Sequence, residues 1–300
     1  MTQKAWILLL SLSAIWGVSF VLIEIGVAHV SVFTMVWLRV GIAGLALLLY
    51  LYLTGQKLPA TRHFWSAAVI MGILNHIIPF SLIAWGQLSI TAGLAAILNA
   101  NTAFAGVIMA ALFVANEPLR RHRLLGVIIG MTGVVLVIGP ETLQELTIGS
   151  LSQLAVIAAT FSYALAAVWG KLRLADYPPL HLACATTLSA TICLTPLLYF
   201  DPDFRLPASI SWDFIAAMLA LGGIGTAVAY GLFYRILTLA GAGNLSLVTI
   251  IVPVFAVMID GVFLDRWIGP EAIAGFIIVA VGLAVVDGRL ITAITRRLTS

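Results

Sequence analysis

Long apolar stretches separated by short polar turns set the pattern of this chain. Ten stretches are each long enough, at about 1.5 Å of rise per residue, to cross roughly 30 Å of hydrocarbon as a helix. Because the turns are short, neighbouring stretches are expected to run antiparallel. The pattern predicts an all-α integral membrane protein with ten transmembrane helices, at residues 5–27, 33–53, 64–86, 90–114, 123–140, 149–171, 180–200, 213–235, 243–264 and 270–290.

The pattern also repeats once along the chain. Residues 88–133 return in altered form as residues 237–282, a displacement of 149 positions. Such internal similarity marks a duplicated unit, and we predict two five-helix repeats at residues 1–140 and 141–300. Because five is odd, the second repeat should enter the membrane inverted. Two inverted halves around a central cavity are typical of transporters, whereas a duplicated scaffold or receptor has no need of mirrored access states.

Composition agrees with a membrane-embedded chain. Hydrophobic residues make up 62% of the sequence and charged residues 9%, against about 25% charged residues in soluble proteins. The net charge of +3 comes from basic turns, so it does not indicate nucleic-acid binding. Cys184 and Cys193 lie in one apolar stretch, about 13 Å apart along a helix and therefore too far apart for a disulfide.

The basic residues predict an orientation. The first apolar run continues to Val27 without a small-x-small cleavage site, so we interpret it as a membrane span and not a signal peptide. Under the positive-inside rule, the bias of the turns places both termini of this multi-pass membrane protein in the cytoplasm. Twelve of the fifteen basic residues fall on that side: Lys4, Lys57, Arg62, Arg120, Arg121, Arg123, Lys171, Arg173, Arg235, Arg289, Arg296 and Arg297.

Short motifs in both halves resemble a known family. Trp16-Gly17, Leu38-Arg39 and Asn116-Glu117-Pro118, followed by Gly126-x6-Gly133, are similar to the EamA repeat of the drug/metabolite transporter superfamily. The resemblance covers about residues 5–140 and 149–290. Within that superfamily the chain looks most like the YddG-type bacterial exporters, which implies a place in the bacterial inner membrane and export of aromatic and other neutral amino acids.

Polar and aromatic groups inside the predicted spans are the candidates for substrate binding, because polar groups in hydrocarbon are costly. They gather on three mirrored pairs of spans, the first and sixth, third and eighth, and fourth and ninth. The alternatives are interhelical bonding for the asparagines, and packing for the histidine and the rings. The candidates are Trp16, His76, Asn99, Asn101, Tyr163, Tyr230, Ser246 and Thr249.

Three charged residues and two prolines complete the candidate set. Glu24 and Arg39 lie at comparable depth in the first and second spans, so we expect a structural ion pair between them in preference to substrate contact. Glu24 and Asp260 are the membrane acids placed to relay a proton. Pro79 and Pro253 free backbone carbonyls and allow bending, which suits gating.

Glycines dominate the fifth and tenth spans. Gly126-x3-Gly130 is the close-packing pattern of helix interfaces. This pair of spans is expected to pack the two halves at the periphery or to form a dimer interface, so monomer and homodimer both stay open.

A cavity lined by amides, hydroxyls and rings suits a zwitterion, which needs hydrogen bonds at both ends and an apolar wall. We therefore expect a secondary transporter that exports small zwitterionic metabolites, chiefly aromatic or neutral amino acids, by alternating access. Efflux of cationic drugs or quaternary ammonium compounds is the alternative, and a facilitating channel is a further one. Phosphorylated substrates would need several basic clamps, and only Arg39 lies within a span.

Enzyme chemistry is not expected. The five histidines, at positions 29, 63, 76, 122 and 181, are scattered, and neither Gly-x-Ser-x-Gly nor HExxH occurs. These patterns carry intramembrane hydrolysis or metal catalysis. The expected partners are a small-molecule substrate and the lipid bilayer, with no metal and no cofactor.

Overall fold

A computed structural model describes residues 2–113, 121–138, 148–201, 204, 211–240, 245, 247–266 and 269–287. The described first half contains α1 (Gln3–His29), α2 (Val32–Leu53), α3 (Arg62–Gly72), η1 (Ile73–Ile77), α4 (Ile78–Gly86), α5 (Ala92–Asn99), α6 (Thr102–Phe113) and α7 (Arg121–Ile138). The second contains α9 (Ile148–Arg173), α10 (Pro179–Tyr199), α11 (Trp212–Leu219), η2 (Ala220–Val228), α12 (Ala229–Ala240), α14 (Leu247–Leu264) and α15 (Pro270–Asp287). Over these residues the predicted all-α class is confirmed, with no strand.

The helices are long and apolar enough for a membrane protein. Seven helical runs qualify as membrane spans by length and composition: Gln3–His29, Val32–Leu53, Arg62–Gly86, Ala92–Phe113, Ser150–Arg173, Pro179–Tyr199 and Trp212–Phe233. Ile251–Leu264 and Pro270–Gly282 are shorter apolar helices. Each of the ten predicted stretches overlaps helical structure among the described residues; that all ten cross a membrane stays a prediction.

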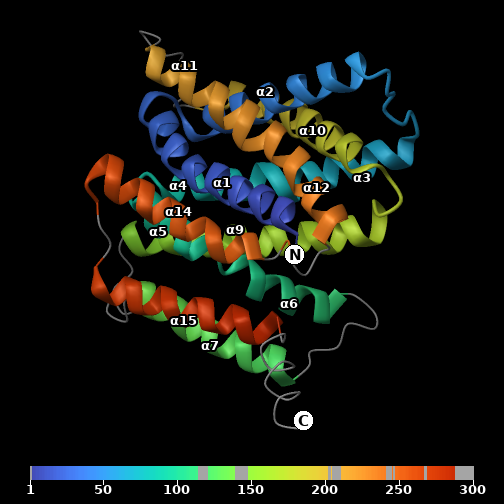
Figure 1. The fold of residues 1–300 in the computed structure, drawn as a ribbon. Coiled ribbons are helices and arrows are strands. Elements are labelled where there is room, and N and C mark those ends of the chain that lie inside the picture. Colours follow the sequence, from blue (N-terminus) through green and yellow to red (C-terminus); the bar gives the residue numbers. More distant parts are fainter. Residues whose placement is uncertain are drawn as a thin grey trace.

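Helices of the two halves pack against one another (Figure 1). α1 lies on α14, α2 on α10, α4 on α9, and α7 on α15. The helix bounds also follow the displacement of 149 residues found in the sequence. Shifting α7 by that amount gives residues 270–287, the bounds of α15, and shifting η1 gives residues 222–226, which lie inside η2. The duplication therefore extends to irregular turns.

Polar residues at the turns start several helices. Thr2, Ser31, Thr61, Thr91 and Ser211 each occupy the N-cap position, and each side-chain oxygen accepts a hydrogen bond from the backbone N–H three residues on. These bonds satisfy donors that the first turn of a helix leaves free. The polar turns thus fix where the apolar helices begin.

Two helices widen locally into π-helical turns. η1 carries Asn75 and His76, and η2 carries Thr226. Pro79 follows η1 in the first turn of α4 and has no N–H to continue the regular ladder. Single π turns within α-helices occur frequently at functional sites, and both of these place polar side chains in the middle of the bundle.

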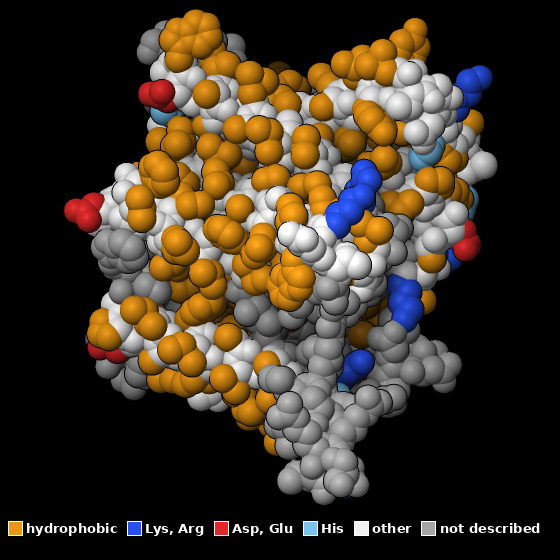
Figure 2. Space-filling model, in the orientation of Figure 1, with side chains coloured by type: hydrophobic (Ala, Val, Ile, Leu, Met, Phe, Trp, Pro, Cys, Tyr) orange, Lys and Arg blue, Asp and Glu red, His pale blue; other side chains and the backbone are white. Residues whose placement is uncertain are grey.

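The outer surface is apolar. Large side chains such as Leu45, Tyr52 and Ile192 are 65%, 79% and 68% exposed. Figure 2 shows hydrophobic side chains over most of one face, with acidic side chains at its margins and few basic ones, one of which lies well inside the face. An apolar surface of this extent is rare on soluble monomers and suits contact with lipid.

The predicted glycine packing is confirmed between α7 and α15, which lie side by side at one edge of the bundle (Figure 1). A Cβ atom added to Gly133 would lie 2.6 Å from the backbone nitrogen of Val279, and one added to Gly282 would lie 2.6 Å from that of Gly130. The two backbones are therefore in direct contact, as small-residue helix interfaces allow. We call this contact the glycine seam.

We predict that Gly282→Ala destabilises the protein. The new methyl group would meet only backbone atoms of α7, which cannot move aside without parting the helices, at a cost of about 1–3 kcal/mol. Thermal unfolding in detergent should show a lower Tm. Gly106→Ala in α6 is the matched control, because its Cβ would meet nothing within 4 Å. Equal Tm values for the two variants would contradict the glycine seam.

Candidate functional site

A buried arginine lies in the middle of the bundle. Arg39 on α2 is 6% exposed, and its Cζ atom lies 3.7 Å from the centre of the Phe80 ring on α4. Its Nε donates a hydrogen bond of 3.1 Å to Thr226 Oγ1 of η2. The cation thus stacks on an aromatic face and is fixed by a hydroxyl group from the other half of the chain.

The expected ion pair between Glu24 and Arg39 is wrong. Glu24 contacts Arg266, which follows α14, and among the described residues no carboxylate pairs with Arg39. The reason is geometric: the two residues lie a similar number of positions from the turn between α1 and α2, but Arg39 reaches the middle of the bundle and Glu24 lies near one end of it. α1 lies along α14, and Glu24 meets the basic residue at the end of that helix.

Aromatic rings from both halves surround Arg39. The His76 ring lies 5.3 Å from that of Phe80 and meets Tyr230 edge-on at 5.9 Å. The Tyr163 ring on α9 lies 6.5 Å from Phe80. We call Arg39, Phe80, His76, Tyr163, Tyr230 and Thr226 the Arg39 cluster. It brings together three predicted binding residues, His76, Tyr163 and Tyr230.

His76 is held by α10. Its Nε2 lies 3.1 Å from Thr186 Oγ1, and the Thr186 hydroxyl donates to the carbonyl of Ala183. Because that hydroxyl proton is already used, Nε2–H is the donor to Thr186, and Nδ1 is left as an acceptor. Nδ1 is buried without a hydrogen-bond partner among the described residues.

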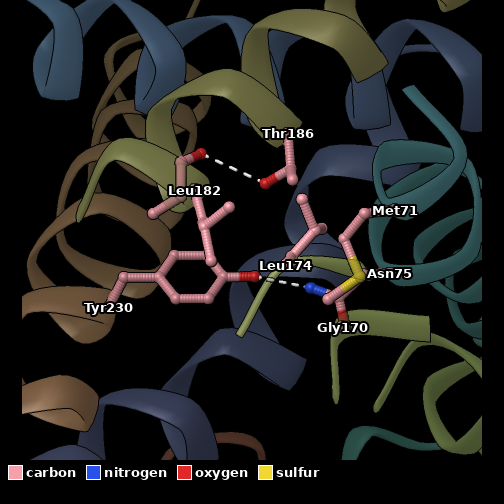
Figure 3. A pocket seen from close by; sticks show the side chains of 8 residues that line it. Met71, Asn75, Gly170, Leu174, Leu182, Thr186 and Tyr230 are labelled. Atoms are coloured by element: carbon pink, nitrogen blue, oxygen red, sulfur yellow. Dashed lines mark hydrogen bonds between the residues drawn. The ribbon is translucent and has the colours of Figure 1, made fainter. Parts of the chain in front are cut away.

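A small pocket adjoins the cluster (Figure 3). Asn75 Nδ2 donates a 2.8 Å hydrogen bond to the Tyr230 hydroxyl at its wall. The free volume is about 40 Å³, enough for water but not for an amino acid. This conformation therefore has no wide cavity at this place. The lining residues are Met71, Asn75, Gly170, Leu174, Leu182, Ala183, Thr186 and Tyr230.

The two predicted asparagines lie at a break between α5 and α6. Asn101 is fully buried, and its Nδ2 donates to Thr160 Oγ1 of α9 at 3.1 Å. The Asn99 carbonyl accepts a 2.7 Å bond from the Thr102 hydroxyl, and its own Oδ1 is buried without a partner among the described residues. Asn101 therefore joins helices, the alternative left open by its sequence.

The remaining predicted residues have separate surroundings. The Trp16 ring lies 6.1 Å from that of Phe233 on α12. Thr249 lies half-buried on α14, and Ser246 falls outside the described residues. Pro79 is buried at the start of α4, and Pro253 is buried within α14.

A second group of polar contacts closes one end of the bundle. Asp260 on α14 is 1% exposed, and its Oδ2 accepts a 3.0 Å bond from the Gly93 backbone at the start of α5. Glu24 pairs with Arg266, and the hydrogen bond that Arg266 donates to this carboxylate raises the pKa of Arg266 above its ordinary value. Ser31 donates to Asp201 at 2.6 Å, and Ser211 lies 3.3 Å from His29 Nε2. We call these contacts the end layer.

Phe80 and Thr186 were not singled out from the sequence. Phe80 follows His76 by four residues, so both are on one helical face, a signal that an analysis of polar residues passes over. Thr186 gave no signal of its own, because threonines in apolar helices commonly bond to their own backbone.

The comparisons with known proteins agree with this picture. A model of the EamA-like transporter family matches residues 3–139 and 150–286. "Uncharacterized transporter YoaV" of Bacillus subtilis is 22% identical, over 93% of this chain and 95% of its own. "Probable amino-acid metabolite efflux pump" of Salmonella typhimurium is 24% identical over 94% of each chain, and its Escherichia coli namesake is 22% identical over 94% of each.

A crystal structure of a protein 17% identical in sequence has a similar fold. The TM-score is 0.68, and the match covers 95% of this chain and 98% of the other. At this identity the likeness concerns the fold alone.

We predict that Asn101 and Thr160 are energetically coupled. A double-mutant cycle with Asn101→Ala, Thr160→Val and the double variant isolates the pair. Interhelical hydrogen bonds of this kind contribute about 0.6–2 kcal/mol in membranes, so the cycle should return a coupling in that range. Reversible unfolding in mixed micelles provides the free energies. A coupling indistinguishable from zero would contradict the joining role of Asn101.

Proposed function

This chain belongs to the EamA-like transporter family, and we propose that it is a secondary transporter that exports small zwitterionic metabolites, chiefly neutral and aromatic amino acids. It is a multi-pass membrane protein by its family and its apolar helices. Two relatives carry the name "Probable amino-acid metabolite efflux pump", and these names support the substrate class.

The composition of the Arg39 cluster carries the proposal. It combines one cation, a histidine acceptor and several ring faces in the middle of the bundle. An amino acid offers a carboxylate, an ammonium group and a side chain, and such a lining has a counterpart for each. The family indicates transport and not catalysis.

Cationic drug efflux receives less support. A cationic substrate would need an acid near the rings, but Glu24 and Asp260 both belong to the end layer. The central charge among the described residues is the cation of Arg39, which would repel such a substrate.

The proposal includes the topology expected from the sequence. Residues 1–140 and 141–300 form two inverted repeats, ten helices cross the membrane, and both termini are cytoplasmic. With that orientation the end layer faces outward. α10 runs from the pocket, where Leu182 lies in its first turn, to the end layer, where Asp201 lies just beyond its last residue. In the proposed orientation the pocket is therefore on the cytoplasmic side.

Alternating access then requires the end layer to part. Its contacts join the first half to the second, as in Glu24 with Arg266 and Gly93 with Asp260. The π-helical turns and the buried Pro79 and Pro253 interrupt the regular backbone hydrogen bonding of the helices that would move. We therefore propose that these helices bend there when the end layer parts. The glycine seam stays closed throughout and holds the halves together.

We expect saturable efflux of amino acids. Liposomes that contain the purified protein and are preloaded with radiolabelled phenylalanine, tryptophan or leucine should release label faster than preloaded liposomes without protein. Unlabelled substrate added outside should accelerate this release by exchange. A proton gradient applied in parallel reports coupling. Transport of tetraphenylphosphonium without amino-acid transport would favour the cationic alternative, and release that does not saturate would favour a channel.

We predict that Asp260→Leu opens the end layer. The variant removes a buried, charge-assisted hydrogen bond to Gly93, worth about 1.5–3 kcal/mol. It should therefore raise the fraction of molecules in which the end layer has parted, by roughly tenfold. A reporter thiol at Ala92→Cys, buried beside this bond, would be labelled in intact cells by an impermeant maleimide. Cys184 and Cys193 are replaced by alanine beforehand.

Glu24→Gln is the matched control for this experiment. Its ion pair with Arg266 is solvent-accessible, at 25% and 46% side-chain exposure, and pairs of this kind contribute about 0.2–1 kcal/mol. Labelling should therefore rise much less than in Asp260→Leu. The role of Asp260 would be contradicted if the two variants were labelled at the same rate.

A further inference from the structure

We propose that Arg39 binds the carboxylate of the transported solute and thereby selects carboxylate-bearing substrates. The inference rests on the proposed export function and assigns its specificity to one side chain. Its basis is the charge of Arg39. This residue is 94% buried, and its guanidinium pairs with no acid among the described residues.

A buried guanidinium without a counter-ion is costly in a membrane protein. The two acids predicted as membrane acids are engaged elsewhere, Glu24 with Arg266 and Asp260 with the Gly93 backbone. Both partnerships belong to the end layer. A solute that brings its own carboxylate would supply the missing negative charge, so the Arg39 cluster favours that class of solute.

The contacts of Arg39 leave one edge of the guanidinium open. Nε is used by Thr226, and the ring of Phe80 covers one face of the plane. Among the described residues neither Nη atom has a hydrogen-bond partner. Two parallel N–H groups match the two oxygens of a carboxylate, whereas a dianionic phosphate is commonly held by more than one basic residue.

The surroundings suit the rest of an amino acid. Nδ1 of His76 is a buried acceptor, available to an ammonium group, and the rings of Tyr163 and Tyr230 offer an apolar wall. Thr186 and Tyr230 belong to the pocket (Figure 3), and both also contact His76. A solute entering that pocket, once widened, would therefore meet this cluster first.

The first test uses the unmodified protein and needs no variant. Liposomes that hold the full chain are preloaded with labelled phenylalanine together with an excess of unlabelled phenylalanine, phenylalaninamide or phenethylamine, so that both solutes compete for the transporter from the same side. The last two keep the ring and the amine but lack the carboxylate. We expect phenylalanine to compete at least tenfold better than either analogue. Equal competition by all three would overturn the role of Arg39.

The second test changes the arginine. Arg39→Gln should lower phenylalanine efflux about 10- to 100-fold, the range expected for losing a charged hydrogen-bonded pair, while transport of phenylalaninamide stays the same or rises. Arg39→Lys keeps the charge but loses the planar fork, so its phenylalanine efflux should be intermediate. Arg173→Gln is the matched control, since Arg173 also lies over a ring, that of Trp169, at 5.6 Å, and should transport normally.

The outcomes separate this inference from the proposed function. Amino-acid efflux by the unmodified protein together with an equal loss of phenylalanine and phenylalaninamide in Arg39→Gln would leave the function standing and overturn the carboxylate contact. No amino-acid transport by the unmodified protein would overturn both. Should Arg39→Gln fail to fold, the competition series alone decides.

Discussion

Hydrocarbon offers a polar group nothing to bond with, and the arrangement of this bundle follows from that constraint. Several described polar side chains in its interior reach across to another helix: Gln87 to the Phe20 carbonyl, Ser162 to the Leu74 carbonyl, and Trp169 to the Ala67 carbonyl. These bonds fix which helices are neighbours. The same constraint makes the exceptions informative, because an interior charge without a partner persists at a cost and indicates a task other than holding helices together.

Apolar length and internal repetition were enough to predict the class of fold. The expected close approach of the fifth and tenth stretches was also right, because small residues at positions such as Gly130 and Gly133 permit only a limited set of helix contacts. Pairing across the bundle was harder. Glu24 and Arg39 lie a similar number of residues from the turn that joins their helices, but Glu24 contacts Arg266 in the end layer and Arg39 stacks on Phe80 in the middle of the bundle. Sequence gives the position of a residue along its helix far better than it gives which residues of other helices it meets.

The interior site shows a similar division. Polarity alone pointed to His76, Tyr163 and Tyr230, which do lie together. It also pointed to Asn101, whose bond to Thr160 joins two helices. The π-helical turns could not be predicted, because a prediction based on 3.6 residues per turn assumes regular backbone hydrogen bonding along each helix. Phe80 was overlooked because an aromatic residue in an apolar helix looks like ordinary packing.

The matching π-helical turns bear on the history of the chain. A π turn holds one more residue than the α turn that it replaces, so it amounts to an insertion accommodated within a helix. η1 and η2 occupy corresponding places in the two halves. The simplest account is that a single ancestral five-helix unit already carried the widened turn before its gene was doubled. The side chains have since diverged, because the displacement of 149 residues carries His76 of η1 onto Gly225 of η2, next to Thr226, while both copies kept the distortion.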